Sequence, residues 1–480
     1  MYSALSLISL LTACGPKTPP QAPTAMVRQF SELPQPLAPR AFQLPEVERG
    51  ELDNGIPVLL SQNSEVPLIF VKVVFEPGGW SETKQHVAKA AMTLIDNGSG
   101  DYNADAFAQK QRELAASVYA SSKLDYSVAG VNTLKKNMDD SIGLLATMLQ
   151  APAFPNEDWE VEQQQLIQNI QSAQQQPSAI CANVFNRLLY GDQYLGTIES
   201  PEAMAQISTK DIKRWHKQNI VPANAKIAVA GATTLEEIIP VLNQHFGQWD
   251  TKGAGLPDKP QSTTLPKAES TKVYLVDKPG AAQSVVRFGQ FTLAESHDDY
   301  LALELANETI GGMFIARVNM NLREDKGWTY GARSWHYPSF VTSRWALSSN
   351  IVTEHTVAAV AEVRKELRQA QEGQPITSDE LTAAKGNILG SFPQQFERPD
   401  SILNEIIRLE TYDLPTDSLK SYPDDIRNLD LAQAQTAWNN YIDIDQLLIV
   451  IVGDAEKIES GLLEQGLPVI RVDETGQKIE

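Results

Sequence analysis

The sequence is poor in cysteine, with two in 480 residues, which excludes a disulfide framework for a chain of this size. Beyond the N-terminus it also lacks any stretch approaching the roughly 20 apolar residues of a transmembrane helix. Basic residues are outnumbered, with 40 Lys and Arg against 60 Asp and Glu. The resulting net charge of −20 argues against nucleic-acid binding, because phosphate contacts require clustered Lys and Arg.

Histidine is scarce as well, and its spacing gives no metal site. The six histidines are His86, His216, His245, His297, His336 and His355. No two are close enough in sequence to share a helix face, so a helix-borne metal site is not predicted. A site assembled from distant residues stays open. We interpret His86 as a solvated helix residue.

The N-terminus has an apolar run from Ala4 that ends in Leu11-Thr12-Ala13-Cys14. It resembles a bacterial lipoprotein signal peptide, which is cleaved before a cysteine that becomes acylated; the alternative is a chance cysteine after an ordinary leader. We expect residues 1–14 to be signal peptide and acylation site, with Cys14 lipid-anchored on the periplasmic side of a bacterial membrane. Gly15 favours the outer membrane. Residues 15–47, with seven prolines from Pro19 to Pro45, are expected to form a stiff tether.

The remaining chain is duplicated. Residues 226–231 and 447–453 are apolar runs that end in glycine and precede segments of helical periodicity. Trp215 and Trp438 precede these glycines by similar distances, and 58–75 and 273–291 each indicate a pair of strands. Matching positions lie about 215 to 222 residues apart, as expected for a repeated unit.

The order of elements predicts an α+β fold with two homologous domains in tandem. Each half runs strand, strand, helices, strand, helix, which favours a mainly antiparallel sheet covered by helices on one face. We place the N-terminal domain at 48–250, a linker rich in Pro, Gly, Ser and Thr at 251–270, the C-terminal domain at 271–470 and a tail at 471–480.

Helical signals cover four segments: 81–96, 156–176, 298–310 and 314–324. A strand is expected to begin after Gly327 and to include Tyr330. Between the last two helices, Gly311-Gly312-Met313-Phe314 is either a substrate-contact loop or a simple helix break.

Arg323 and Tyr330, seven residues apart in N-L-R-E-D-K-G-W-T-Y-G, resemble the arginine/tyrosine pair of the pitrilysin (insulinase-type) zinc peptidases, in their processing-peptidase branch. Further matching motifs from 48 to 465 are Leu52-Asp53-Asn54-Gly55, Gly78-Gly79, Ala306-Asn307, Gly311-Gly312, Glu380-Leu381 and Ala384-Lys385-Gly386-Asn387. The resemblance implies that the two domains form half of a clamshell.

Active members of that family carry an inverted H-x-x-E-H on the first long helix and a glutamate about 75 residues later. The resemblance places Lys89 at the first histidine, Met92 at the catalytic base, Thr93 at the second histidine and Asn169 at the third ligand. All four functional positions of the zinc site are therefore degenerate. We expect no metal or cofactor bound by this chain.

The retained pair suits transition-state stabilisation, since a guanidinium can hold a peptide carbonyl and a phenol can donate to an oxyanion. The alternative is a purely structural role, in which Arg323 pairs with Glu324 or another carboxylate and Tyr330 packs on the sheet. The first hypothesis is a non-catalytic subunit of a heterodimeric periplasmic zinc endopeptidase, which lends Arg323 and Tyr330 to a homologous partner that carries the zinc and cleaves a peptide or unfolded protein. The alternatives are a lipoprotein that binds peptides by strand pairing and a structural envelope protein.

Overall fold

The computed structural model describes residues 43–63, 65–249, 259–260, 269–340, 342–415 and 417–479. The expected signal peptide with Cys14, most of the tether and most of the 251–270 linker lie outside the described residues. Residues from Leu44 onward form one compact unit. None of the helices in the described ranges has the length and apolar character of a membrane span.

The first domain contains a six-stranded sheet in the order β1-β2-β6-β3-β5-β4. Its strands are β1 (Glu48–Glu51), β2 (Pro57–Gln62), β3 (Leu68–Phe75), β4 (Ser117–Ser122), β5 (Ser127–Leu134) and β6 (Ala225–Gly231). Only β2 and β6 pair in parallel; the other neighbours are antiparallel. The helices in this half are α1 (Val87–Leu94), α2 (Ala104–Glu113), α3 (Met138–Gln150), α4 (Asn156–Ala173), α5 (Pro177–Tyr190), α6 (Pro201–Ala205), α7 (Thr209–Asn219) and α8 (Leu235–Phe246).

The second domain has a matching sheet with the order β12-β7-β11-β8-β10-β9, in which β7 pairs in parallel with both β11 and β12. Its strands are β7 (Lys272–Asp277), β8 (Gln283–Thr292), β9 (Thr329–Tyr337), β10 (Ser343–Val352), β11 (Leu448–Gly453) and β12 (Val469–Val472). The helices are α9 (Tyr300–Asn307), α10 (Arg317–Asn319), α11 (Thr356–Glu372), α12 (Ser378–Ser391), α13 (Pro399–Thr411), α14 (Ser418–Asn428), α15 (Leu431–Tyr441) and α16 (Ala455–Glu464).

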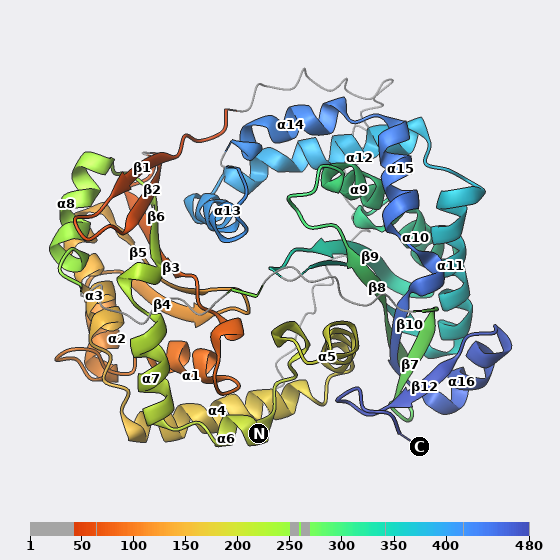
Figure 1. The fold of residues 1–480 in the computed structure, drawn as a ribbon, viewed down its shortest axis with the longest axis horizontal. Helices are drawn as coiled ribbons and strands as arrows, with labels where there is room; N and C mark the ends of the chain where they lie inside the picture. Colours follow the sequence, from red (N-terminus) through yellow and green to blue (C-terminus); the bar gives the residue numbers. More distant parts are fainter. Residues whose placement is uncertain are drawn as a thin grey trace, which may run out of the picture. The chain divides into compact units, whose positions relative to one another are not determined.

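The duplication predicted from the sequence is confirmed in these elements. β6 leads into α8 and β11 leads into α16, while Trp215 on α7 and Trp438 on α15 are both buried. Helices such as α3 and α8 cover one face of the first sheet, and α11 and α16 cover the matching face of the second (Figure 1). The α+β prediction with two tandem domains is therefore correct.

Each sheet is also covered on its second face, by a helix from the other half of the chain. Because side chains alternate along a strand, Ile227 and Val229 of β6 face the helices of their own domain, whereas Ala228 and Ala230 pack against α13. In the second domain, Val450 of β11 packs against α5 in the same way. These crossed helices explain why β6 and β11 are almost continuously apolar and why the two halves form one unit.

The predicted helix boundaries need correction near the candidate site. The helix expected at 81–96 begins only at Val87, because His86 adopts a left-handed conformation with φ of 71°. The segment expected at 314–324 becomes helical only at Arg317 and continues as a π-helical turn, Met320–Asp325. The helix expected at 298–310 likewise ends in a π-helical turn, Glu308–Gly312, so the break at Gly311-Gly312 is real.

Candidate functional site

Three of the four degenerate positions lie together on α1. Met92 is buried in the core of the first domain, with 1% of its surface exposed, and Thr93 is half-buried. The Lys89 ammonium forms an ion pair with Glu199, which ties α1 to the segment before α6. The position of the first histidine is thus occupied by a cation that already has a carboxylate partner.

The side chain of Glu82 fixes the start of α1. Its two carboxylate oxygens accept hydrogen bonds from the backbone N–H groups of His86 and Ala88, at 2.7 and 2.9 Å. These bonds satisfy donors that the first helical turn leaves free. Burial raises the pKa of Glu82 to about 7. The backbone hydrogen bonds lower this pKa in part, and the nearby charge of Glu199 raises it further.

His86 is buried, and our interpretation of it as a solvated residue is wrong. Only 6% of its surface is exposed, and its Nε2 accepts a hydrogen bond from the backbone N–H of Ser200 at 3.1 Å. Burial is the main cause that lowers its pKa. The histidine therefore serves as a neutral structural acceptor that joins α1 to the start of α6.

Asn169, the fourth degenerate position, lies on α4, which packs against α1. Its side chain is exposed and accepts a hydrogen bond from Gln165 on the same helix at 2.9 Å. An ammonium, a thioether, a hydroxyl and an amide thus stand where two imidazoles and two carboxylates would be needed, and this set does not fit zinc. Across the described ranges, no group of three or more His, Cys, Asp or Glu side chains is placed to hold a metal ion.

Arg323 lies in the second domain, in the π-helical turn Met320–Asp325. Its Nε forms an ion pair with Glu324 at 3.2 Å, as expected if Arg323 has a purely structural role. Its guanidinium also lies over the Phe314 ring, with 4.6 Å between Cζ and the ring centroid. About a third of the Arg323 side chain remains exposed, at 37%, so the guanidinium is within reach of a ligand.

Tyr330 lies on β9, the edge strand of the second sheet, where the sequence placed it. It does not pack on the sheet, since 91% of its surface is exposed. Tyr330 and Arg323 belong to elements that pack against each other. Within the described part of the chain, no hydrogen bond or ion pair joins their side chains, so both are available to a third group.

The first half of the β9 edge is already occupied by side chains. The backbone N–H of Ala332 donates to Asn319 Oδ1 at 3.0 Å, and that of Gly331 donates to Thr329 Oγ1 at 3.0 Å. A peptide strand could add to this edge only by displacing these bonds. Near Tyr330, the geometry therefore favours recognition by side chains over strand addition.

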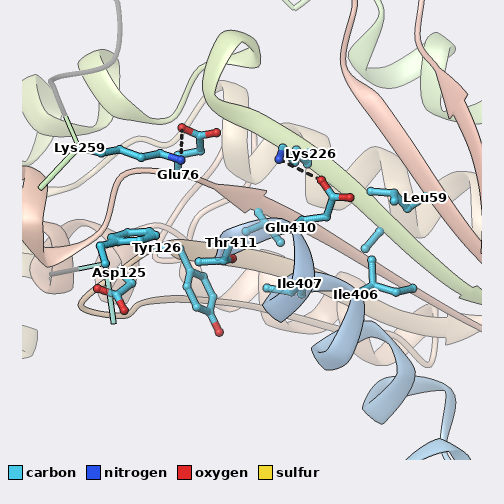
Figure 2. Close-up of a pocket in the computed structure, with 13 residues that line it drawn as sticks. Leu59, Glu76, Asp125, Tyr126, Lys226, Lys259, Ile406, Ile407, Glu410 and Thr411 are labelled. Carbon is cyan, nitrogen blue, oxygen red and sulfur yellow. Dashed lines mark hydrogen bonds and ion pairs between the residues drawn. The ribbon is translucent and has the colours of Figure 1, made fainter. Parts of the chain in front are cut away.

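The contact between α13 and the first sheet leaves a pocket that is too small to be a substrate site. Figure 2 shows its lining, with Lys226 paired to Glu410 at 3.0 Å and Lys259 paired to Glu76 at 3.3 Å. Its volume of about 20 Å³ is little more than room for one water molecule. The pocket marks a packed junction between the halves.

Sequence reasoning missed Phe314, Asn319 and Glu82. Phe314 lies nine residues before Arg323 and Asn319 lies 13 before Ala332, so neither contact follows helical or strand spacing. Glu82 could have been predicted as a capping residue, since a carboxylate near a helix start is favourable. The predicted start at residue 81 instead placed Glu82 inside the helix.

The comparisons with known proteins agree with this architecture. The model of the insulinase family (peptidase family M16) matches residues 58–201, and the model of the peptidase M16 inactive domain matches residues 206–388. The uncharacterized zinc protease YmxG of Bacillus subtilis is 22% identical over 74% of this chain and 86% of its own length. The non-peptidase homolog YmxG of Helicobacter pylori is 21% identical over 84% of this chain and 93% of its own length.

Solved structures show the same fold. A peptidase M16 inactive domain from Pseudomonas fluorescens superimposes with a TM-score of 0.78 at 21% identity, covering 85% of this chain and 98% of that one. A protease from Helicobacter pylori gives 0.77 at 20% identity, with coverage of 85% and 100%. The two matching family models show that the chain belongs to peptidase family M16, the insulinase family. Because its metal positions are degenerate, it is an inactive member.

Proposed function

We propose that this chain is the non-catalytic subunit of a two-chain zinc endopeptidase, in which a homologous partner carries the intact H-x-x-E-H motif. The chain supplies half of the chamber together with Arg323 and Tyr330. The observation that carries the proposal is the exposure of Tyr330: a phenol that is 91% exposed on an edge strand contributes little to the core of its own fold. An interaction outside the chain gives it a role.

The chemistry of the pair supports binding of a peptide bond under attack. Arg323 offers fixed N–H donors to a peptide carbonyl, and Tyr330 offers one O–H donor to the oxyanion that develops on that carbonyl. Such donors stabilise the transition state more than the bound substrate, so they act mainly on turnover. Metal binding and the general base are assigned to the partner, because Lys89, Met92, Thr93 and Asn169 supply neither.

We further propose that the subunit is lipid-anchored through Cys14 on the periplasmic side of a bacterial membrane, in the outer membrane. This rests on the Leu11-Thr12-Ala13-Cys14 motif and the proline-rich tether that follows. Mass measurement of the mature N-terminus tests it: an acylated cysteine is the expected result, and an unmodified N-terminus upstream of Cys14 would contradict it.

A structural role is the second candidate, favoured by one comparison. Subunit 1 of the bovine mitochondrial cytochrome b-c1 complex is 21% identical over 56% of this chain and 56% of its own length. By that analogy the chain would serve as a scaffold in an envelope complex. The exposed Tyr330 favours the peptidase-subunit function, because a scaffold has no need of an exposed phenol on the strand that packs against the turn of Arg323.

Reconstitution distinguishes the two functions. The purified chain should show no stoichiometric zinc and no cleavage of an internally quenched peptide library. Mixing with a homologous subunit that has an intact H-x-x-E-H motif, encoded by the same genome, should produce a heterodimer and peptide cleavage above that of the partner alone. A stable complex whose activity equals that of the partner alone would favour the scaffold.

A further inference from the structure

We propose that Phe314 is a positioning residue for Arg323, and that Asn319 holds Phe314 in place for this purpose. The inference rests on the proposed function, since it states how the chain prepares Arg323 for a peptide carbonyl. Three contacts in the second domain carry it: a ring under the guanidinium, a buried amide that donates to the backbone carbonyl of Phe314, and a bond from that amide to the strand that bears Tyr330.

The ring of Phe314 is poorly placed for a role in the core. It is 48% exposed at the start of the segment between two π-helical turns, and the neighbouring Ile315 is 57% exposed. An aromatic residue at such a site gains little from burial. Its specific contact is the Arg323 guanidinium, 4.6 Å from Cζ to the ring centroid. A guanidinium on an aromatic face is held flat, with its N–H donors directed outward along its edge.

Asn319 connects this ring to the strand of Tyr330. The side chain is buried, with 3% exposed, and both ends of its amide are used. Nδ2 donates to the backbone carbonyl of Phe314 at 2.6 Å, and Oδ1 accepts from the backbone N–H of Ala332 at 3.0 Å. Ala332 lies two residues after Tyr330 on β9. One side chain therefore fixes the distance between the backbone under the ring and the backbone beside the phenol.

The backbone around these residues is irregular on both sides. The chain makes π-helical turns at Glu308–Gly312 and Met320–Asp325, with the Phe314 segment between them. Such turns are rare in helices and are often found at functional sites. The second turn includes Arg323, so the irregular geometry sets the direction from which this side chain approaches Phe314.

The ring holds the Arg323 guanidinium while the neighbouring Glu324 pairs with its Nε. Glu324 pairs with Arg323 Nε at 3.2 Å, and both side chains are partly exposed. Without the ring, the long arginine side chain has more conformations in which Glu324 or water holds its donors. The ring restricts the guanidinium to one plane, so its remaining donors stay available to a peptide carbonyl.

The first experiment measures coupling in the assembled peptidase, with an internally quenched peptide as the substrate. Phe314→Leu, which keeps apolar volume but removes the aromatic face, should lower kcat/KM about two- to fivefold, the effect expected for an exposed cation–π contact. Phe314→Trp should keep the activity. Arg323→Gln should lower it further, and Phe314→Leu added to Arg323→Gln should have no additional effect, because the ring acts only through the guanidinium.

The second experiment needs no partner. In the isolated chain, loss of the ring uncovers one face of the Arg323 guanidinium. Its modification by phenylglyoxal, followed by mass spectrometry, should therefore be faster in Phe314→Leu than in the unchanged chain, with Arg214 as the exposed internal reference. Melting temperatures of the variants should match, since Phe314 is half exposed. An unchanged modification rate would overturn the inference whatever the partner does.

The outcomes separate this inference from the proposed function. If Arg323→Gln lowers activity and Phe314→Leu leaves it unchanged, the positioning role is wrong and the proposed function stands. If Arg323→Gln has no effect on the assembled enzyme, the proposed role of Arg323 fails, and a positioning role of Phe314 in catalysis fails with it. Additive losses in the double variant would also contradict the inference, because they would show that Phe314 acts independently of Arg323.

Discussion

The half-buried Glu304 should make the stability of this protein fall as the pH rises. Glu304 lies on α9 and lines a cavity of about 410 Å³ together with Glu295, Glu405 and Asp425. Burial, followed by the charges of Glu308 and Glu295, raises the pKa of Glu304 from 4.5 to about 7. Below about pH 7 the neutral carboxyl is therefore the favoured form in the folded chain.

Proton linkage gives the direction and the size of this change in the unfolding free energy. Between pH 4.5 and 7 the folded chain binds more protons at Glu304 than the unfolded chain does, so the free energy of unfolding decreases as the pH rises. A difference of about 2.5 pKa units at about 1.36 kcal/mol each gives about 3 kcal/mol, most of it lost between pH 5 and 8. Glu304→Gln removes the titration and keeps the shape of the side chain.

Urea unfolding at pH 5 and pH 8 measures this effect. The unfolding free energy of Glu304→Gln, relative to the unchanged chain, should increase by about 2 to 3 kcal/mol from pH 5 to pH 8. Glu464→Gln, at an exposed position on α16, is the matched control and should show no such increase. If Glu304→Gln keeps the pH dependence of the unchanged chain, the carboxyl is not held neutral in the cavity and the reasoning is refuted.

Three other substitutions test the junction of the halves and the degenerate motif. Leu403→Ala, at a buried position on α13, should lower the unfolding free energy by about 2–5 kcal/mol in urea, whereas Val161→Ala, at an exposed one, should change little. Asp125→Ala should lower the melting temperature more than Asp125→Asn, because alanine leaves the phenols of Tyr194 and Tyr412 without their acceptor. Lys89→Met breaks a half-exposed ion pair and should cost less than about 1 kcal/mol; a larger loss would show that the pair is essential to α1.

The fold was largely predictable because its strongest signals are local. The apolar runs that became β6 and β11, each ending in glycine before a helix, could be located from periodicity, and the repeat of these runs gave the two domains. Gly327 marks the turn before β9, so the sequence predicts the strand of Tyr330 correctly. The resemblance located α1 and α4, and the structure puts Lys89, Met92, Thr93 and Asn169 on these two adjacent helices.

The missed features depend on contacts between distant segments. A polar His86 near a predicted helix start is expected at the surface. It lies inside because Glu82 caps the start of α1 and the backbone N–H of Ser200 donates to its ring. The crossed packing of α13 and α5 was also hidden, since an amphipathic helix does not reveal which sheet it will cover. In the same way, the exposure of Tyr330 depends on its strand being an edge, which is a property of the assembled sheet.

The turnover of the proposed two-chain peptidase with Tyr330→Phe tests the central claim most directly. Loss of one donor to the oxyanion should lower kcat on the order of 100-fold with a small change in KM, and the complex should still form. Tyr337→Phe, on the same strand, is the matched control and should leave kcat unchanged. If Tyr330→Phe cleaves peptides as fast as the unchanged complex, this chain does not lend its phenol to the reaction of its partner.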